Sequence, residues 1–255
     1  MSKINNPIFI GVYDTLSSLL VTQKHSNIFL SGLSYTASRY GLPDIGFLTW
    51  QDVVGQAELI MTCCPGCNLL VDLDDGFGGT EIASFVAKKL ENIGVFGIVV
   101  EDQKRPKKCG HLPGKKIIPL DEHLEIIEAI TKSTQNLFVV ARTDANDESE
   151  VIRRITAYNK TDVNAILVDG ISFDQYLKLK SMVSKPLVYN FVVGGNSENL
   201  QDTADIILCS MGCISAVGES INNMIDGVLA KDYTILNNTE FNLNKLRKYT
   251  ERLFN

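Results

Sequence analysis

The 255-residue sequence has no apolar run long enough to cross a membrane, and residues 1–10 lack the pattern of a signal peptide. It also lacks an excess of basic residues. The formal net charge is -6, which argues against a general nucleic-acid-binding protein. No linker and no low-complexity segment divides the chain. We therefore expect one cytoplasmic domain over residues 1–255, with a helical tail from about residue 231 and no membrane or nucleic-acid partner.

A dinucleotide-binding fingerprint is also missing, because no Gly-x-Gly-x-x-Gly follows the first apolar segment.

Cys64 and Cys67 have the spacing of redox or zinc sites. A zinc site would need a second such pair, and only the more widely spaced Cys209 and Cys213 are available. A thioredoxin-like pair opens a helix, whereas this pair precedes an apolar segment. We interpret Cys64 and Cys67 as small residues in a tight turn between a helix and a strand.

The most informative stretch runs from Asp72 to Gly79, directly after an apolar segment that ends at Val71. It places three carboxylates, including Asp72 and Asp74, within four positions and then breaks into glycines. Buried carboxylates close together are costly unless a cation compensates them, and oxygen ligands suit Mg²⁺. Asp72 and Asp74 are expected on one face because strand side chains alternate. An acidic, solvated turn is the alternative interpretation.

Eight short apolar segments recur along the chain, separated by stretches with helical spacing such as Ile82, Phe85, Val86 and Leu90. Parallel strands buried on both faces have this pattern. Eight such units in about 250 residues predict an α/β fold, a (β/α)₈ TIM barrel, rather than an open sheet. The segments are Pro7–Gly11, Ile28–Gly32, Leu69–Asp72, Phe96–Glu101, Leu137–Arg142, Ala165–Asp169, Pro186–Asn190 and Asp205–Cys209.

Polar residues stand at the ends of most of these segments. They are Ser31, Gly32, Asp72, Asp74, Glu101, Asp102, Arg142, Asp169 and Asn190. The carboxyl ends of barrel strands converge on one rim, where active sites lie. A rim with several carboxylates and one arginine predicts a cation site beside an anion site.

A basic loop follows the fourth segment, from Gln103 to Lys116, with six Lys or Arg residues in an acidic protein. Cationic loops beside a metal site attract and enclose anionic substrates, so we interpret this loop as a lid; a solvated basic loop is the alternative. Cys109 lies two residues before His111. A thiol beside several cations is expected to have a lowered pKa and to act as a proton donor or nucleophile.

Seven short motifs follow one another along the chain; each is modest alone, but their order and spacing together are specific. They are Val12-Tyr13-Asp14-Thr15-Leu16-Ser17, Ser31-Gly32-Leu33, Gly41-Leu42-Pro43-Asp44, Val71-Asp72-Leu73-Asp74-Asp75-Gly76-Phe77-Gly78, Val100-Glu101-Asp102-Gln103, Pro106-Lys107-Lys108-Cys109-Gly110-His111 and Ala141-Arg142-Thr143-Asp144-Ala145. On these motifs the chain resembles the isocitrate lyase/phosphoenolpyruvate mutase superfamily from Gly11 to about Ala230. The lid motif with Cys109 and His111 resembles that of the branch with methylisocitrate lyase, dimethylmalate lyase and oxaloacetate hydrolase.

The resemblance implies Mg²⁺, with Mn²⁺ as an alternative. The ion is expected to be held mainly by Asp72, with Asp74, Glu101 and Asp44 holding it directly or through water. It implies a small anionic oxo or hydroxy acid as substrate, and a homo-oligomer, a dimer or a tetramer, that exchanges its eighth helix. The expected substrate-binding residues are Ser31, Gly32, Leu33, Asp44, Arg142 and Asn190. The expected catalytic residues are Cys109, His111, Arg142 and Glu101.

The sequence departs from the family pattern at Leu73, where alanine is usual, and at Val193, where lyases carry a glutamate. The Ser31-Gly32-Leu33 motif is more like that of the mutases. The C-terminus is short for the family, so the exchanged helix is expected to be reduced or absent. We expect a carbon–carbon lyase or hydrolase acting on a 2-hydroxy or 2-oxo di- or tricarboxylate. Phosphonopyruvate or phosphoenolpyruvate mutase chemistry, oxaloacetate decarboxylation and a binding role without catalysis are the alternatives.

Overall fold

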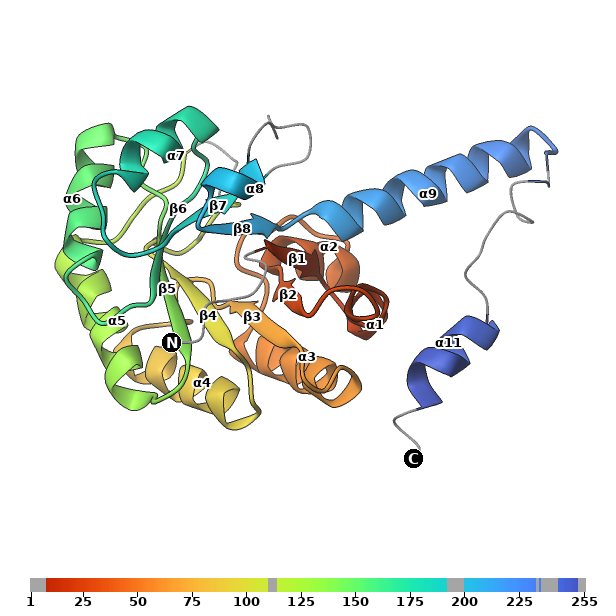
Figure 1. The fold of residues 1–255 in the computed structure, drawn as a ribbon, viewed down its shortest axis with the longest axis horizontal. Coiled ribbons are helices and arrows are strands. Elements are labelled where there is room, and N and C mark those ends of the chain that lie inside the picture. The colour runs from red at the N-terminus through yellow and green to blue at the C-terminus, as the bar shows by residue number, and fades with distance from the viewer. Residues whose placement is uncertain (1–7, 110–113, 192–199, 233, 235–242, 252–255) are drawn as a thin grey trace.

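A computed structural model of the chain describes residues 8–109, 114–191, 200–232, 234 and 243–251. Eight parallel strands close into a barrel in which each strand pairs with its sequence neighbours and β8 pairs with β1 (Figure 1). The predicted (β/α)₈ barrel is therefore confirmed. The strands are β1 Ile8–Val12, β2 Asn27–Leu30, β3 Asn68–Asp72, β4 Gly97–Glu101, β5 Phe138–Thr143, β6 Ala165–Val168, β7 Leu187–Asn190 and β8 Ile206–Cys209.

Helices follow the strands, and most of them cover the outside of the barrel, whereas α9 and α11 lie away from it (Figure 1). They are α1 Thr15–Thr22, α2 Gly32–Tyr40, α3 Trp50–Cys63, α4 Thr80–Asn92, α5 Leu120–Ser133, α6 Glu148–Tyr158, α7 Phe173–Lys180, α8 Leu200–Thr203, α9 Gly212–Leu229 and α11 Leu243–Thr250. Among the described residues, no helix combines the length and the apolarity needed to cross a lipid bilayer.

Local sequence signals account for most of these helices. Asp14 and Thr49 cap α1 and α3 through side-chain hydrogen bonds to the first turn. In α4 the buried stripe is Ala83, Val86, Ala87 and Leu90, whereas the predicted stripe included Phe85. Phe85 is instead 51% exposed and lies edge-on to Trp50 of α3.

The barrel interior is built in layers that alternate between odd and even strands. One apolar layer consists of Phe29 from β2, Val99 from β4, Leu167 from β6 and Leu208 from β8, and all four are buried. Because strand side chains alternate, the residue two positions further along each of these strands also faces inward. Those four residues are all polar: Ser31, Glu101, Asp169 and Ser210. Inside the barrel, an apolar layer is therefore followed by a polar layer nearer the carboxyl ends of the strands.

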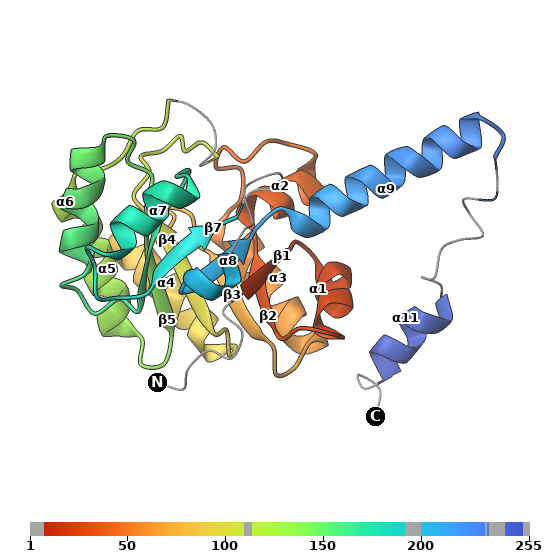
Figure 2. The ribbon, with the colours of Figure 1, turned by 45° about the horizontal axis from the view of Figure 1, so that its top comes forward.

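The helix that follows β8, α9, does not pack on the barrel as the earlier helices do. This 18-residue helix has no buried residue and projects away from the barrel in both views (Figures 1 and 2). Its exposed apolar side chains recur at helical spacing: Val217, Ile221, Met224, Ile225 and Val228. The expectation of a reduced or absent eighth helix was therefore wrong, because this helix is long and carries an apolar stripe. The tail beyond residue 231 contains α11, as predicted.

The turn between α3 and β3 holds the Cys64/Cys67 pair. Cys64 ends α3, and the backbone N–H of Cys67 donates to the carbonyl of Cys64 at 3.2 Å. Both side chains are buried. The pair therefore lies in the tight helix-to-strand turn that the sequence predicted.

Candidate active site

A cavity opens at the carboxyl end of the barrel, above the apolar layer. Its empty volume is ≈ 440 Å³, including the part that is open to solvent. It is lined by Phe29, Ser31, Leu33, Asp44, Asp72, Val99, Cys109, Arg142, Leu167, Asp169, Asn190, Leu208, Ser210 and Met211. Seven of the predicted site residues thus meet at one cavity, although they come from different strands and loops.

Ser31 and Gly32 form one wall where β2 passes into α2. The Ser31 hydroxyl caps the helix by accepting from the Ser34 N–H at 3.3 Å. The Gly32 N–H points at Asp72 Oδ2 at 3.4 Å, and a Cβ at Gly32 would lie 3.0 Å from that same oxygen. Glycine is therefore needed here because the backbone of α2 approaches the acidic end of β3.

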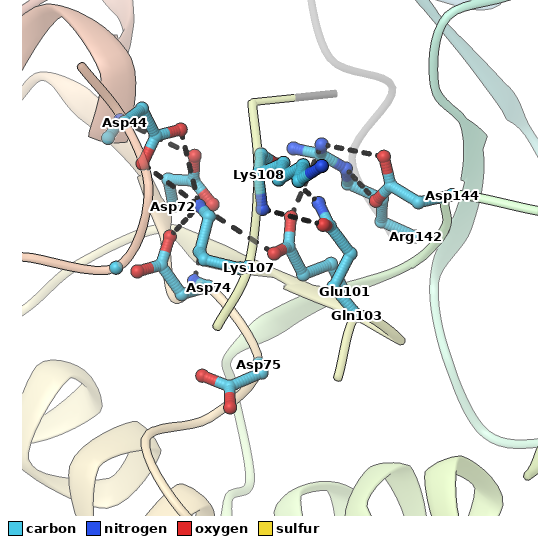
Figure 3. Close-up of polar contacts among 12 residues, drawn as sticks. Asp44, Asp72, Asp74, Asp75, Glu101, Gln103, Lys107, Lys108, Arg142 and Asp144 are labelled. Carbon is cyan, nitrogen blue, oxygen red and sulfur yellow. Dashed lines mark hydrogen bonds and ion pairs between the residues drawn. The ribbon is translucent and has the colours of Figure 1, made fainter. Parts of the chain in front are cut away.

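Asp72 and Asp74 both face the site, but not for the predicted reason. The strand ends at Asp72, and Asp74 adopts a left-handed backbone with φ of 49°. The Asp74 carbonyl accepts from the Glu101 N–H at 2.8 Å, which ties this turn to the end of β4. The turn, rather than strand alternation, brings the Asp74 carboxylate to the rim. Asp75 points away and pairs with Arg105 (Figure 3).

Lys107, from the basic loop, lies at the centre of the acidic residues. Its ammonium nitrogen lies 3.2 Å from both carboxylate oxygens of Asp44 and 3.6 Å from Glu101 Oε1, and it also contacts Asp74 (Figure 3). The side chain is only 1% exposed. Lys107 was not singled out from sequence, where it was one of several loop cations.

Arg142, at the end of β5, is held by three carboxylates. Its Nε and Nη2 donate to the two oxygens of Asp144 at 2.9 and 3.1 Å. Nη2 also lies 3.0 Å from Asp169 Oδ2 and 3.2 Å from Glu101 Oε2. Lys115 of the basic loop makes a second ion pair with Asp144 at 3.0 Å. Arg142, the predicted cationic clamp, is thus held by several carboxylates. Its bidentate partner Asp144 was not among the predicted site residues.

A hydrogen-bonded chain continues from this arginine around the rim. Asn190 Nδ2 donates to Asp169 Oδ1 at 2.8 Å, and the Ser210 hydroxyl donates to Asn190 Oδ1 at 2.9 Å. Asn190 was predicted to bind substrate, whereas Asp169 and Ser210 were not assigned a role. The sequence placed Asp169 at the rim but missed Ser210, which lies two positions beyond the inward-facing Leu208 and could have been found by strand alternation.

A second buried network lies behind Asp144. Asp102 Oδ1 accepts from the Asp144 N–H at 2.9 Å, and Asp102 Oδ2 accepts from Arg154 at 2.8 Å and from the Tyr158 hydroxyl at 3.2 Å. The Tyr158 hydroxyl lies 2.8 Å from His123 Nδ1. Burial lowers the pKa of His123 to about 3, so this imidazole is neutral. This network fixes α5 and α6 to the strand ends and has no contact with the cavity.

The acidic residues of the site are poorly compensated. Six carboxylates (Asp44, Asp72, Asp74, Glu101, Asp144 and Asp169) face three buried cations (Lys107, Lys115 and Arg142) and the partly exposed Arg105, which lies 3.8 Å from Asp74 Oδ2. Burial raises the pKa of Asp72 to about 6 and raises the pKa of Glu101 well above its usual range. Burial alone would lower the pKa of Lys107, but the carboxylates of Asp74 and Glu101 raise it well above its ordinary value.

These features fit a divalent cation. Neither side-chain oxygen of Glu101 accepts a hydrogen bond within the described part of the chain, and neither does Asp74 Oδ2, although all three atoms are buried. From the residues that the structure describes, Asp72 accepts only the backbone N–H groups of Gly32 and Asp74. Within the described residues, no three acidic, histidine or cysteine side chains are close enough to complete a metal site by themselves. A cation here would therefore be held by few protein ligands and by water.

Two predicted positions lie outside the described residues: His111 of the lid motif and Val193, the position of the family glutamate. Cys109, the last described residue before the gap, is buried and lines the cavity. The pKa predicted for its thiol stays a prediction.

The chain is similar to known proteins along most of its length. Residues 2–227 match the family model described as phosphoenolpyruvate phosphomutase. A 2-methylisocitrate lyase of Bacillus subtilis (strain 168) is 35% identical over 192 residues, which cover 73% of this chain and 63% of that protein. A 2-methylisocitrate lyase of Shewanella oneidensis is 31% identical over 86% of this chain and 80% of that protein.

Among solved structures, an oxaloacetate acetylhydrolase in complex with the inhibitor 3,3-difluorooxalacetate superposes with a TM-score of 0.88 at 25% identity, covering 96% of this chain and 88% of that one. The chain spans 63% of the length of the Bacillus subtilis protein, and the same share of a 2-methylisocitrate lyase of Halalkalibacterium halodurans.

Proposed function

Because the chain belongs to the phosphoenolpyruvate mutase/isocitrate lyase superfamily, we propose that it is a Mg²⁺-dependent carbon–carbon lyase or hydrolase acting on a 2-hydroxy or 2-oxo di- or tricarboxylate. The observation that carries this proposal is one cavity in which Ser31, Asp72, Cys109 and Arg142 meet above an apolar floor. The oxo-acid ligand named for the acetylhydrolase structure supports a substrate of the same class.

Asp72 is the first ligand that we assign to Mg²⁺, or to Mn²⁺ as the alternative. Among Asp44, Asp72, Asp74 and Glu101, it is the one whose carboxylate lies more than 4 Å from the charged nitrogens of every lysine and arginine in the described part of the chain. Asp44, Asp74 and Glu101 share Lys107, so we assign them to water molecules around the cation. When bound, the cation supplies a Lewis acid for the negative charge that develops on the oxo-acid oxygen.

The chain's own residues bind and orient the substrate. The Ser31 hydroxyl and the first turn of α2 face the cavity, and the N-terminal end of a helix favours a carboxylate. Arg142 lines the cavity and supplies the cationic partner for the substrate's negative end. Its three carboxylate partners fix its orientation before substrate arrives, which reduces the ordering cost of binding.

In a lyase reaction of this class, the substrate hydroxyl gives its proton to a carboxylate that lines the cavity, and the carbon–carbon bond breaks to give an oxo acid. The bonding electron pair stays on the carbon of the second carboxylate-bearing fragment, which then takes up a proton. We assign that proton to the Cys109 thiol, which lines the cavity, and we assign binding of the fragment to His111.

A substrate panel tests the proposal. The full chain is supplied with Mg²⁺ and 2-methylisocitrate, 2,3-dimethylmalate, oxaloacetate or phosphonopyruvate, and released oxo acid is measured. Cleavage of a hydroxy acid or of oxaloacetate to oxalate and acetate is expected. Turnover of phosphonopyruvate alone, or decarboxylation of oxaloacetate, would favour the mutase or decarboxylase alternative. Absence of any turnover, together with absence of Mg²⁺-dependent oxalate binding, would favour a barrel with a binding role.

We also propose that the chain forms a homo-oligomer through α9. The helix is unburied, and its apolar stripe needs a partner surface. Exposed Leu16 and Leu20 on α1 and Leu177 on α7 flank the place on the barrel that a helix after β8 would cover. A second copy supplies that helix by exchange. A cytoplasmic location stays a prediction from the sequence.

A further inference from the structure

The basic loop after β4 is closed at its base by backbone pairing. Gln103 and Ile117 form an antiparallel bridge. On either side of it, the Lys104 N–H donates to the Lys116 carbonyl at 2.8 Å and the Ile118 N–H donates to the Asp102 carbonyl at 2.9 Å. These contacts fix where the loop begins and ends. They do not reach the part of the loop that carries Lys107 and Cys109.

The side chain of Gln103 makes that connection. Its Nε2 donates to the Lys108 carbonyl at 2.8 Å, and its Oε1 accepts from the Lys108 N–H at 2.9 Å (Figure 3). One side-chain amide thus pairs with both backbone groups of a single residue, in the way that a neighbouring strand would. Gln103 is 1% exposed, so these two hydrogen bonds are sheltered from water.

The residues on either side of Lys108 both reach the site. Lys107 and Cys109 are buried, whereas Lys108 is exposed. Lys107 contacts the carboxylates of Asp44 and Asp74, and Cys109 lines the cavity. Fixing the backbone of Lys108 therefore fixes both neighbours at once.

We propose that Gln103 is a positioning residue for the reaction: its side-chain amide clamps the backbone of Lys108 and thereby sets the Lys107 ammonium on the acidic residues and the Cys109 thiol at the cavity. The kinetic part of this proposal rests on the proposed function, whereas the placement of Cys109 does not. If its role is purely structural, Gln103 contributes to the stability of the fold but does not affect the positions of Lys107 and Cys109.

Three variants of the full chain separate these roles. Gln103→Met keeps the length of the side chain and loses both hydrogen bonds. Gln103→Glu keeps the acceptor for the Lys108 N–H and loses the donor to the Lys108 carbonyl. Gln56→Met is the matched control, because Gln56 is also a buried glutamine but lies on α3, away from the loop.

The first measurement is the rate at which iodoacetamide alkylates Cys109, resolved by mass spectrometry of the cysteine-containing peptides, with buried Cys64 as the internal reference. We expect Gln103→Met to raise the Cys109 rate roughly tenfold to hundredfold, the effect of two lost hydrogen bonds, with an unchanged Cys64 rate. Gln103→Glu should lie between it and the wild type. The proposal would be overturned if Cys109 were alkylated at the same rate in Gln103→Met as in Gln56→Met. It would also be overturned if the alkylation rate of Cys64 rose in parallel in Gln103→Met. If Gln103→Met does not fold, Gln103→Glu decides by the same criterion.

The second measurement is turnover with Mg²⁺ on whichever panel substrate the wild type cleaves. We expect kcat to fall about tenfold or more in Gln103→Met while KM changes less than about threefold, because substrate binding groups outside the loop are untouched. A kcat equal to that of Gln56→Met would overturn the proposal. If the wild type cleaves no panel substrate, the proposed function fails, and the alkylation rates alone decide the role of Gln103.

Discussion

The Lys107 ammonium nitrogen lies 3.2 Å from both carboxylate oxygens of Asp44, a residue 63 positions earlier in the chain. The same nitrogen contacts Asp74 and lies 3.6 Å from Glu101 Oε1. One loop lysine therefore compensates three buried carboxylates that come from three other segments. The positive charge of Lys107 therefore offsets the repulsion among these buried carboxylates, which leads to the first prediction.

Replacing Lys107 by methionine should destabilise the metal-free protein by about 3–5 kcal/mol, because the buried carboxylates lose their counter-charge. Millimolar Mg²⁺ should restore much of this loss by supplying positive charge at the same place. Urea unfolding with and without Mg²⁺ measures both effects. Lys104→Met is the control, since Lys104 is exposed in the same loop. Equal stabilities for the two variants would contradict the compensating role of Lys107.

Replacing Asp72 by alanine should weaken Mg²⁺ binding by about 100-fold or more, because Asp72 is the assigned direct ligand. Asp74→Asn should cost only the roughly 10- to 100-fold that is typical of an outer-shell partner. Isothermal titration of Mg²⁺ into both variants gives the comparison. An unaltered titration for Asp72→Ala would remove the assignment.

Replacing Cys109 by serine should reduce turnover by roughly 10²- to 10⁴-fold, the usual contribution of a proton donor in the transition state. Binding of Mg²⁺ and of pyruvate should stay intact, because Cys109 is not assigned to either. Steady-state kinetics and calorimetry check the two halves of this expectation. The same change at Cys63, which is outside the cavity, is the control. Unchanged turnover would exclude Cys109 from the mechanism.

The buried imidazole of His123 should make the protein acid-sensitive. Its folded pKa of about 3 lies below the ordinary value of 6.5, so the unfolded chain binds the additional proton first. The contribution to stability is fully present above pH 6.5 and is lost as pH falls towards 3, by about 1.4 kcal/mol per pH unit. In His123→Gln the free energy of unfolding should fall less steeply between pH 6 and 4. Parallel pH profiles for variant and wild type would contradict this account.

The apolar stripe of α9 should control the oligomeric state. Ile221 is 48% exposed, and Ile221→Glu places a charge in the centre of the stripe. We expect the dominant species to shift to a lower mass in light scattering coupled to gel filtration, because burying an unpaired carboxylate opposes association. Asn222→Glu, at an exposed position beside the stripe, should keep the wild-type mass. A monomeric wild type would exclude exchange of α9.

The sequence by itself determined the barrel and most of the rim. Buried strands leave a local pattern of apolar residues, and each predicted strand matches an observed one to within two residues at either end. The polar residues at the ends of those strands, such as Asp72, Glu101, Arg142 and Asn190, do lie together at one mouth of the barrel. The alternation of side chains along a strand and the convergence of strand ends in a barrel follow from backbone geometry. Both could therefore be predicted from short stretches of sequence.

Tertiary structure alone decided which charges meet. No local pattern shows that Lys107 reaches Asp44 and Asp74, or that Arg142 is shared by Glu101, Asp144 and Asp169, because these pairs form only when the barrel closes. The left-handed turn at Asp74 and the projection of α9 were also decided at that level. Backbone periodicity is a property of neighbours in the chain, whereas the pairing of buried charges depends on distances across the whole fold.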